Sequence, residues 1–396
     1  MQKASPKAIH FLGLTQIFSY GLLYYVFAIL KEPLAQHVAV SPDTILKAIS
    51  ALLFIQAILS YLIGQFVDRI GGLRVLGTGL LLGSIGIGAL WIVPSFWWVC
   101  LCLGIIGISF SLATYEVAFS IAVQLDERRS RHLISVISFY GGVASTVVWL
   151  IFSPILSHFG LITACLSAAA ILASLGSIAL YLSGSVQPLH ARLATQTDFS
   201  FGLLSKIEKN ALLLIAGSNA IYYMAFSAVT LLWISWFSSS LGNMTLAVIL
   251  ASLFGPFQVV GRVIEMRFAH KIDARITGII AFCLIICGIL LAMIPHPALA
   301  VISMILYGIG NGIITIMFGF VTNLYFSANV YGRAKGLITI PRGFGMALGP
   351  FLGSVFYGLY DGLFLPIIAG FVVMALLQFA LLLRLPVANN VHQNKT

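Results

Sequence analysis

The sequence predicts an all-α membrane protein with twelve transmembrane helices, arranged as two pseudo-symmetric bundles of six. Three observations predict this fold class: the composition, the recurrence of apolar segments and the placement of the basic residues. Of the 396 residues, 60% are hydrophobic and 8% are charged, whereas a soluble protein has roughly 45–50% apolar and 25% charged residues. A chain this apolar is expected to lie in a lipid bilayer.

Apolar segments long enough to span a bilayer follow one another along nearly the whole chain. A span needs about 20 residues to cross a hydrocarbon core about 30 Å thick. Charges, prolines and glycines divide the sequence into twelve such segments, near residues 8–30, 44–66, 74–94, 97–124, 132–156, 160–182, 210–238, 244–266, 276–295, 297–325, 334–358 and 362–384. The first segment is too long for a signal peptide and lacks a small-residue cleavage site, so we expect it to be retained as a helix.

The formal net charge of +10 is explained by the orientation of the chain in the membrane. With the N-terminus in the cytoplasm, eighteen of the 21 basic residues fall on the cytoplasmic side; Lys31 and Lys47 fall outside, and Arg342 lies within a helix. This is the positive-inside pattern. We therefore expect an integral protein of the inner or plasma membrane with both termini in the cytoplasm, and no nucleic-acid partner.

The two halves of the sequence resemble each other. Residues 131–160 align without gaps with residues 333–362, and "GQFVD" at Gly64 matches "GRVIE" at Gly261. The longest polar stretch separates the halves. We expect an N-terminal bundle over residues 1–182, a cytoplasmic linker over residues 183–209 and a C-terminal bundle over residues 210–396. A duplicated six-plus-six architecture in a membrane is typical of secondary transporters.

A short polar turn, "GQFVDRIGGLR" over residues 64–74, lies between the second and third segments. Gly64, Asp68, Arg69, Gly71 and Arg74 resemble the loop 2–3 signature of the major facilitator superfamily, G-x-x-x-D-R-x-G followed by basic residues. The twelve helices, the linker and the second copy of the motif extend this resemblance over essentially the whole chain. At Gly72 and Leu73 the sequence departs from the family, which often has basic residues there.

The resemblance implies a gating role for Gly64, Asp68, Arg69 and Arg74. Asp68 is expected to face the start of the eleventh helix, around residues 332–335, and Arg74 to pair with Asp126 or Glu127. These contacts would form a latch on the cytoplasmic side in the outward-open state. The alternative is a plain anchoring turn with surface charges.

Two ionisable residues lie deep within predicted helices. Glu116 is ten residues before Asp126, and Arg342 is nine residues after Arg333, which places both about 14–15 Å from the cytoplasmic boundary, near the middle of the bilayer. A charge there costs at least about 2.5–3.5 kcal/mol and marks a functional site by default. The resemblance places their helices around the central cavity.

We expect Arg342 to bind an anionic substrate group, because guanidinium pairs bidentately with carboxylate or phosphate. The alternative is a structural arginine neutralised by Glu116. Glu116 is the candidate carrier for proton coupling, because partial desolvation brings a carboxylate pKa toward the working range. Here the alternative is a permanent ion pair with Arg342.

Polar and aromatic side chains form stripes at helical spacing, which places each set on one helix face. These stripes are the remaining candidates for substrate binding: Gln16, Tyr20 and Tyr24; Asn219, Tyr222 and Tyr223; Tyr307 and Asn311; and, less strongly, Tyr140. The alternative for each is a hydrogen bond that joins helices. The many tyrosines suggest a substrate with an apolar or planar body.

No enzyme motif is present, neither a nucleotide-binding P-loop, nor H-E-x-x-H, nor G-x-S-x-G, and we expect no cofactor and no metal. We therefore expect a monomeric secondary transporter that takes a small organic anion, with proton coupling through Glu116. One alternative is a drug/proton antiporter, although "GMALGPFLG" at Gly345 lies in helix eleven and not in helix five, where the antiporter signature occurs. A second alternative is a transporter-like sensor without net flux.

Overall fold

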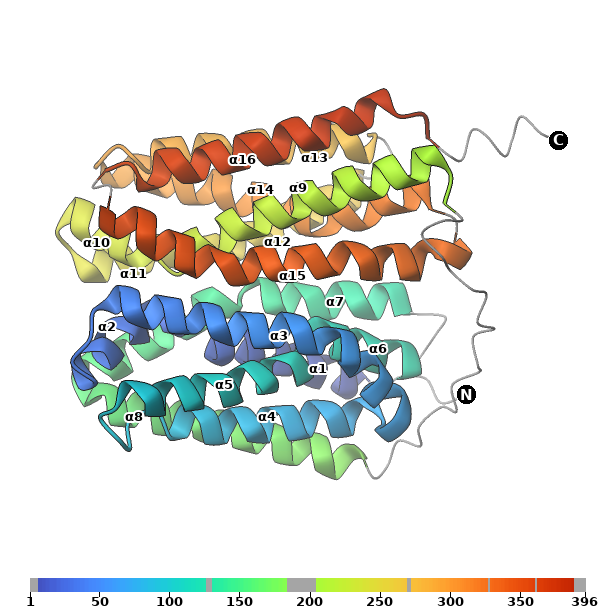
Figure 1. The fold of residues 1–396 in the computed structure, drawn as a ribbon. Coiled ribbons are helices and arrows are strands. Elements are labelled where there is room, and N and C mark those ends of the chain that lie inside the picture. The colour runs from blue at the N-terminus through green and yellow to red at the C-terminus, as the bar shows by residue number, and fades with distance from the viewer. Residues whose placement is uncertain are drawn as a thin grey trace. The chain divides into compact units, whose positions relative to one another are not determined.

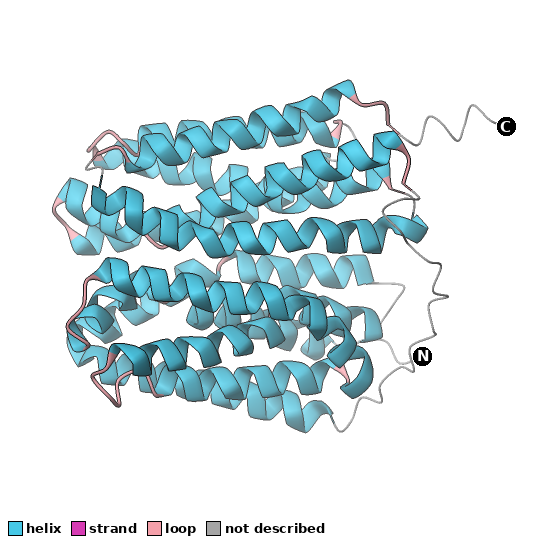
Figure 2. Cartoon of the chain, viewed as in Figure 1, coloured by secondary structure: helices cyan, strands magenta, loops and turns pink. Residues whose placement is uncertain are grey.

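The chain is helical throughout its described parts, and the predicted all-α class is confirmed. The computed structural model describes residues 6–125, 130–183, 204–268, 272–326, 328–359 and 362–387, and these contain no strand (Figure 2). The helices are α1 Pro6–Tyr20, η1 Gly21–Tyr25 (a π-helix), α2 Phe27–His37, α3 Pro42–Ile70, α4 Gly72–Gly88, α5 Phe96–Leu112, α6 Tyr115–Leu125, α7 Ser130–Gly142, α8 Ala144–Ser183, α9 Lys206–Thr230, α10 Trp233–Leu241, α11 Met244–Ser252, α12 Phe254–Phe268, α13 Ala274–Leu291, α14 Pro297–Tyr325, α15 Ala328–Leu359, α16 Phe364–Ala380 and η4 Leu381–Arg384.

The helices are consistent with the twelve spans expected from the sequence. Among the described residues, nine stretches are long and apolar enough to cross a membrane. One of them, Val136–Ser183, has 48 residues, about twice the length that one span needs, and its helix α8 is interrupted at Gly160, where φ is +78°. Three further helical stretches bring the number of spans to twelve. They are the second half of α8, the shorter apolar helix Gly72–Gly88 and the proline-containing α15.

Several spans that the sequence predicts as continuous are interrupted in the structure. The segment expected at 97–124 breaks at residues 113–114, the one at 210–238 breaks at 231–232, and the one at 244–266 breaks at residue 253. At the first of these, Ser111 and Thr114 turn their hydroxyls back onto carbonyls three residues earlier. Such bonds compete with the helix and bend it, and apolar periodicity does not report them.

The contacts divide the chain into two compact units, which are described separately. Unit 1 comprises Met1–Arg192 with Thr230–Gly255, and unit 2 comprises Leu193–Val229 with Pro256–Thr396. In unit 1, α4 packs against α5 and α8, and in unit 2, α13 packs against α14 and α16 (Figure 1). Of the expected linker, residues 184–203 lie outside the described residues, and the division into two six-helix bundles stays a prediction.

Unlike in a soluble protein, many large apolar side chains are exposed, and a set of polar side chains is buried. Large apolar side chains such as Ile85, Trp97 and Leu377 are exposed, whereas Gln16, Asn311 and Arg262 are buried. Hydrocarbon solvates apolar side chains as well as a protein core does, so a membrane protein has little reason to bury them and strong reason to bury its polar groups. The buried polar groups therefore mark the parts of each unit where function is to be sought.

Candidate functional site

In unit 1, the first polar stripe lies against the break in the fourth span. Gln16, Tyr20 and Tyr24 follow one another at intervals of four residues, and Tyr24 lies in the π-helix Gly21–Tyr25. Tyr20 contacts Phe110 edge-on at 5.1 Å and Tyr115 at 4.6 Å between ring centroids. A single π turn within an α-helix is frequent at functional sites. The structure therefore brings this predicted stripe together with the two ends of α5 and α6.

Gln16 stabilises the break itself. Its Nε2 donates to the carbonyl of Ala113, 3.4 Å away, between the last residue of α5 and the first of α6. A broken helix within a membrane needs donors for the carbonyls it releases, and Gln16 supplies one. Its Oε1 is buried with no hydrogen-bond partner among the described residues. Gln16 thus joins two spans and still presents one unsatisfied acceptor.

Glu116 lies in the first turn of α6, directly after this break. Its side chain is exposed. A carboxylate in a first helical turn is stabilised by about 0.3–1 kcal/mol through the helix dipole. The sequence analysis missed its neighbour Tyr115, whose ring stacks on Phe119 at 5.2 Å as well as contacting Tyr20. The sequence contained a signal for Tyr115, because this aromatic residue directly precedes the carboxylate of Glu116.

In unit 2, Arg342 lies over the ring of Tyr223, with 4.2 Å from its guanidinium carbon to the ring centroid. Arg342 is half-buried in α15 and Tyr223 is buried in α9. A cation–π contact of this kind contributes about 0.5–2 kcal/mol. The structure therefore brings together two of the residues that the sequence analysis singled out.

The register of this contact is set by glycines. A Cβ at Gly345 would fall on the carbonyl oxygen of Ala220, and a Cβ at Gly349 would fall on the hydroxyl of Ser227. Only glycine at these positions lets α15 approach α9 so closely, as at small-residue helix interfaces in membranes. The GMALGPFLG motif thus serves helix packing, and it holds Arg342 one turn away from the close contact.

The other predicted residues of unit 2 are buried. Tyr222 packs among Tyr223, Phe226 and Phe282, with centroid distances of 5.3, 6.2 and 5.7 Å. Asn219 in α9 and Asn311 in α14 are 4% and 1% exposed, and Tyr307 is buried one turn before Asn311. Asn219 Oδ1 and Asn311 Nδ2 have no hydrogen-bond partner in the described chain, although buried polar atoms normally have one.

Tyr140 lies apart from the aromatic cluster of unit 1. Its hydroxyl is 2.7 Å from Nδ1 of His10, and its ring lies where a side chain at Gly13 would be. His10 is exposed. Tyr140 is therefore engaged near an exposed part of α1, whereas Tyr20 and Tyr24 contact the break in the fourth span.

The predicted gating turn has a clear backbone geometry. α3 ends at Ile70, and Gly71 then adopts φ +89° before α4 begins. This region of φ is unfavourable for residues with a Cβ, which explains the glycine. Arg69 and Arg74 are exposed. The surroundings of Gly64 and Gly332, the side chain of Asp68, residues 126 and 127, and the side chains at 333 and 335 lie outside what the structure describes.

A buried lysine is the main polar feature that the sequence analysis did not use. Lys31 in α2 is 2% exposed, and its Nζ donates to the carbonyl of Leu231 at 2.9 Å and to the hydroxyl of Ser235 at 2.6 Å. Ser235 in turn donates to Glu32 at 3.1 Å. All four residues belong to unit 1. The signal in the sequence was a cation on the side predicted to face away from the cytoplasm, where the sequence places few cations.

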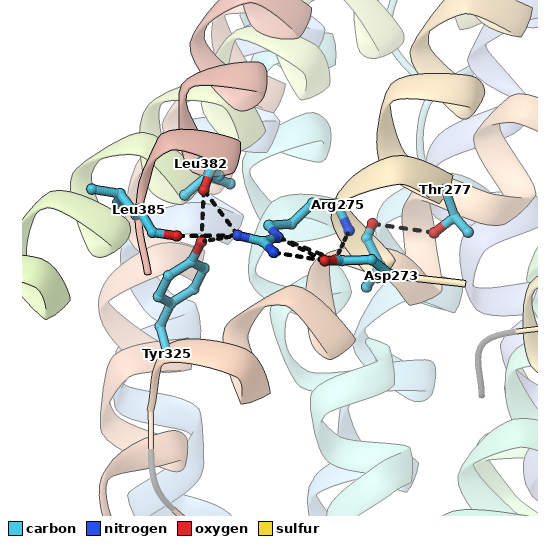
Figure 3. Close-up of polar contacts among 7 residues, drawn as sticks. Asp273, Arg275, Thr277, Tyr325, Leu382 and Leu385 are labelled. Carbon is cyan, nitrogen blue, oxygen red and sulfur yellow. Dashed lines mark hydrogen bonds and ion pairs between the residues drawn. The ribbon is translucent and has the colours of Figure 1, made fainter. Parts of the chain in front are cut away.

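Arg275 ties together three helices at one end of unit 2 (Figure 3). Its guanidinium donates to Asp273 at 2.6 Å, to the carbonyl of Leu385 at 3.1 Å and to the hydroxyl of Tyr325 at 3.4 Å. The side-chain hydrogen bonds that Arg275 donates to Asp273 favour the charged carboxylate, and they lower the pKa of Asp273 from its usual value. This cluster stabilises the unit and is remote in sequence from the predicted substrate residues.

No metal site emerges from the described residues. They contain no group of three or more His, Cys, Asp or Glu side chains that could hold a metal ion. The cysteines are unpaired thiols, buried at Cys102 and Cys165 and exposed at Cys283 and Cys287. What the geometry offers instead is buried polar groups, a broken helix and a stacked arginine, as in proteins that bind and release a solute within the membrane.

The fold is similar to that of solved transporter structures. A crystal structure of a mutant of the nucleoside transporter NupG gives a TM-score of 0.75 at 15% sequence identity, covering 95% of this chain and 99% of the other. A crystal structure of a bacterial homologue of the human lysosomal transporter Spinster, in an inward-facing and occupied conformation, gives a TM-score of 0.73 at 14% identity, covering 98% of each chain. At such identities the likeness extends to the fold alone.

The sequence itself matches a family. None of the curated proteins compared with the chain matches it significantly, but the family model of the Major Facilitator Superfamily matches residues 12–350. That match covers most of the chain and both units. The chain therefore belongs to the Major Facilitator Superfamily, and it is an integral membrane transporter and not an enzyme.

Proposed function

We propose that this transporter moves a small organic anion with an apolar or planar body by alternating access, coupled to protons. Arg342 binds the anionic group and Glu116 carries the proton. The observation that carries the proposal is the half-buried guanidinium of Arg342, 4.2 Å above the ring of Tyr223. The N–H donors of a guanidinium lie in its own plane, where a carboxylate or phosphate pairs with two of them.

The energetics favour a ligand at this arginine. A charged residue in the middle of a span costs at least about 2.5–3.5 kcal/mol, and a cation–π contact returns about 0.5–2 kcal/mol. A bound anion adds charge-assisted hydrogen bonds of about 1.5–3 kcal/mol. Tyr223 at the same time offers a face for a planar substrate body.

The remaining predicted residues supply polar and aromatic contacts. Gln16 Oε1, Asn219 Oδ1 and Asn311 Nδ2 are buried atoms without hydrogen-bond partners in the described chain. Leaving such an atom unsatisfied costs about 1–3 kcal/mol, which a substrate hydroxyl, amide or carbonyl would recover. Further contacts are proposed for the tyrosines of the stripes: Tyr20, Tyr24, Tyr140, Tyr222 and Tyr307.

Glu116 is proposed as the proton carrier because of its place at the helix break. It is the ionisable group of α6 and lies in the first turn after the interruption, so a movement at the break changes its surroundings directly. Covering an ionised carboxylate is costly, whereas covering a protonated one costs far less. Proton binding would therefore permit closure over Glu116, and closure would be slow without it.

We also propose the orientation and the gate that the sequence predicts. Both termini lie in the cytoplasm, because the basic residues concentrate at that side. The turn at residues 64–74, with Gly64, Asp68, Arg69 and Arg74, forms a latch on the cytoplasmic side. Its corner is Gly71, whose φ of +89° turns the chain between α3 and α4.

The test is a thermal-shift screen of organic anions on purified protein, followed by counterflow in reconstituted vesicles. Arg342→Gln is expected to weaken binding of any stabilising anion about 10- to 150-fold, the equivalent of 1.5–3 kcal/mol. Arg342→Lys is the matched control, because it keeps the charge and loses the bidentate geometry, and it should fall in between. Anion binding that survives Arg342→Gln unchanged would overturn the assignment, and binding restricted to cations would favour a drug exporter.

A further inference from the structure

Helix α12 of unit 2 is polar on its buried face and apolar on its exposed face. The buried residues Gln258, Arg262 and Glu265 recur at intervals of three and four residues, whereas Val263, Met266 and Phe268 on the other face are exposed. This arrangement is the inverse of a soluble amphipathic helix, and it is expected for a helix whose outer face meets lipid. Glu265, at 1% exposure, is the most deeply buried side chain of the last turn.

The contacts around Glu265 indicate which protonation state of its carboxyl group agrees with the hydrogen bonding. Thr277 in α13 has its hydroxyl oxygen 3.0 Å from Glu265 Oε1 and 3.1 Å from the carbonyl oxygen of Ala274. A hydroxyl has one proton to donate and two lone pairs with which to accept, and both neighbours would be acceptors if Glu265 were ionised. Both contacts are full hydrogen bonds only when Glu265 is protonated and donates to Thr277, which then donates to Ala274.

No cation compensates the carboxyl group. Within the described residues the one ion pair is between Arg275 and Asp273, and Glu265 is not part of it. Of the charged groups nearby, Arg262 and Arg267 are on the same helix. Arg262 directs its Nε to the hydroxyl of Thr315 at 3.2 Å.

Among the described residues, the neighbouring helices add no free charge at Glu265. At the start of α13, Arg275 is occupied by Asp273 and by groups at the ends of α14 and α16. Helix α14, which packs against α12 at Gly312, contains no Asp, Glu, Lys, Arg or His. A buried, uncompensated carboxyl group is far more favourable as the neutral acid.

We propose that Glu265 is a proton-binding site of unit 2 and is occupied by a proton in this conformation. It lies three residues before the end of α12, so water needs to penetrate less than one helical turn to reach it. When the proton leaves, the nearest cation on its own face is Arg262, because residues three apart are neighbours on a helix. Arg262 would then turn from Thr315 in α14 toward Glu265, and deprotonation would loosen α12 from α14.

The protonation of Glu265 does not depend on the proposed transport function, but its part in coupling does. The experiment therefore has two independent measurements. The first is the infrared difference spectrum of purified wild type minus Glu265→Gln at neutral pH, which is expected to contain the C=O stretching band of a protonated carboxyl group. Carboxylate bands alone in that spectrum would overturn the proposal.

Two further variants make the infrared result specific. Glu208→Gln is the matched control, because Glu208 accepts from the backbone N–H of Ser205 in a cap at the start of α9. This substitution should remove carboxylate bands only. Thr277→Val keeps the volume and removes the hydroxyl, so it should shift the C=O band of Glu265 to higher frequency. An unshifted band in Thr277→Val would show that the protonated Glu265 is not hydrogen-bonded to Thr277. The Thr277→Val variant also provides the test if Glu265→Gln does not fold.

The second measurement is the pH dependence of solute exchange in vesicles, with whichever anion the thermal-shift screen identifies. Glu265→Gln is expected to flatten the pH profile, because a glutamine cannot release a proton. A pH profile identical to wild type would overturn the coupling role. Failure of every anion to bind would instead overturn the proposed function, and the infrared measurement would still decide the protonation.

Discussion

Replacement of Lys31 by methionine tests how the end of the seventh span is held in unit 1. The Lys31 ammonium donates to Leu231 at 2.9 Å and to Ser235 at 2.6 Å, and Leu231 lies in the break between α9 and α10, where helical hydrogen bonding is interrupted. Methionine fills much of the same volume and removes the charge.

The magnitude follows from what the substitution leaves behind. Two charge-assisted hydrogen bonds contribute about 1.5–3 kcal/mol each, but most of that gain offsets the cost of burying the ammonium. Ser235 can still bond to Glu32, to which it donates at 3.1 Å. The uncompensated loss is therefore one buried carbonyl, at about 1–3 kcal/mol. Local opening of α10 should become about 5- to 150-fold more frequent.

Hydrogen–deuterium exchange of the purified protein measures this opening. Peptides that cover α10, Trp233–Leu241, are expected to exchange faster in Lys31→Met by that factor, and peptides of α13 should be unchanged. Lys47→Met is the matched control, because Lys47 is the other cation predicted on that side and is exposed. Equal protection of α10 in wild type and Lys31→Met would refute the view that the ammonium holds the break.

Three further substitutions test other parts of the structure. Gly345→Ala places a Cβ on the carbonyl of Ala220, so it should cost about 1–3 kcal/mol of overpacking and lower both the melting temperature and anion affinity; a variant with wild-type values would mean that α9 and α15 do not pack this closely. Because the pKa of Asp273 is lowered by Arg275, the pair contributes stability above the unfolded pKa of about 4 and loses it as the pH falls through the folded value. The midpoint temperature of thermal unfolding should therefore be lower for Asp273→Asn than for wild type near pH 7, and the two midpoints should converge in acid. A difference in midpoint that does not change with pH would count against the pair. Gly71→Ala forces a Cβ into φ +89°, ψ 139° and should destabilise by about 1–3 kcal/mol in the same assay; an unchanged midpoint would show that the turn relaxes.

The positions of the spans were predictable because they depend on local composition. Hydrocarbon selects about 20 apolar residues per crossing wherever they occur in the chain. The expected segment at 297–325 coincides with α14, Pro297–Tyr325, and the one at 44–66 lies within α3, Pro42–Ile70. The family was predictable for a related reason, because the turn at residues 64–74 is a short local motif with a glycine where φ is positive.

The interruptions of the helices were not predictable, because each depends on residues distant in the chain. The break after α5 is stabilised by Gln16, nearly one hundred positions earlier in the sequence, and the break after α9 by Lys31. A hydropathy pattern contains no information about such donors. The sequence analysis accordingly read Gln16 as a substrate contact or as a hydrogen bond between helices, without naming its partner, and it read Lys31 only as an exception to the charge pattern.

By itself, the sequence determined what the bilayer requires: how many apolar segments there are, which residues are too costly to face lipid, and where a short motif turns the chain. Only the tertiary structure decided which of those costly residues meet. It places Arg342 on Tyr223 through close packing at Gly345, and it buries Glu265 beside Thr277. The physical reason is that desolvation is a property of one residue and its surroundings in the membrane, whereas a hydrogen bond or a stacked ring requires two groups at a distance of a few ångströms.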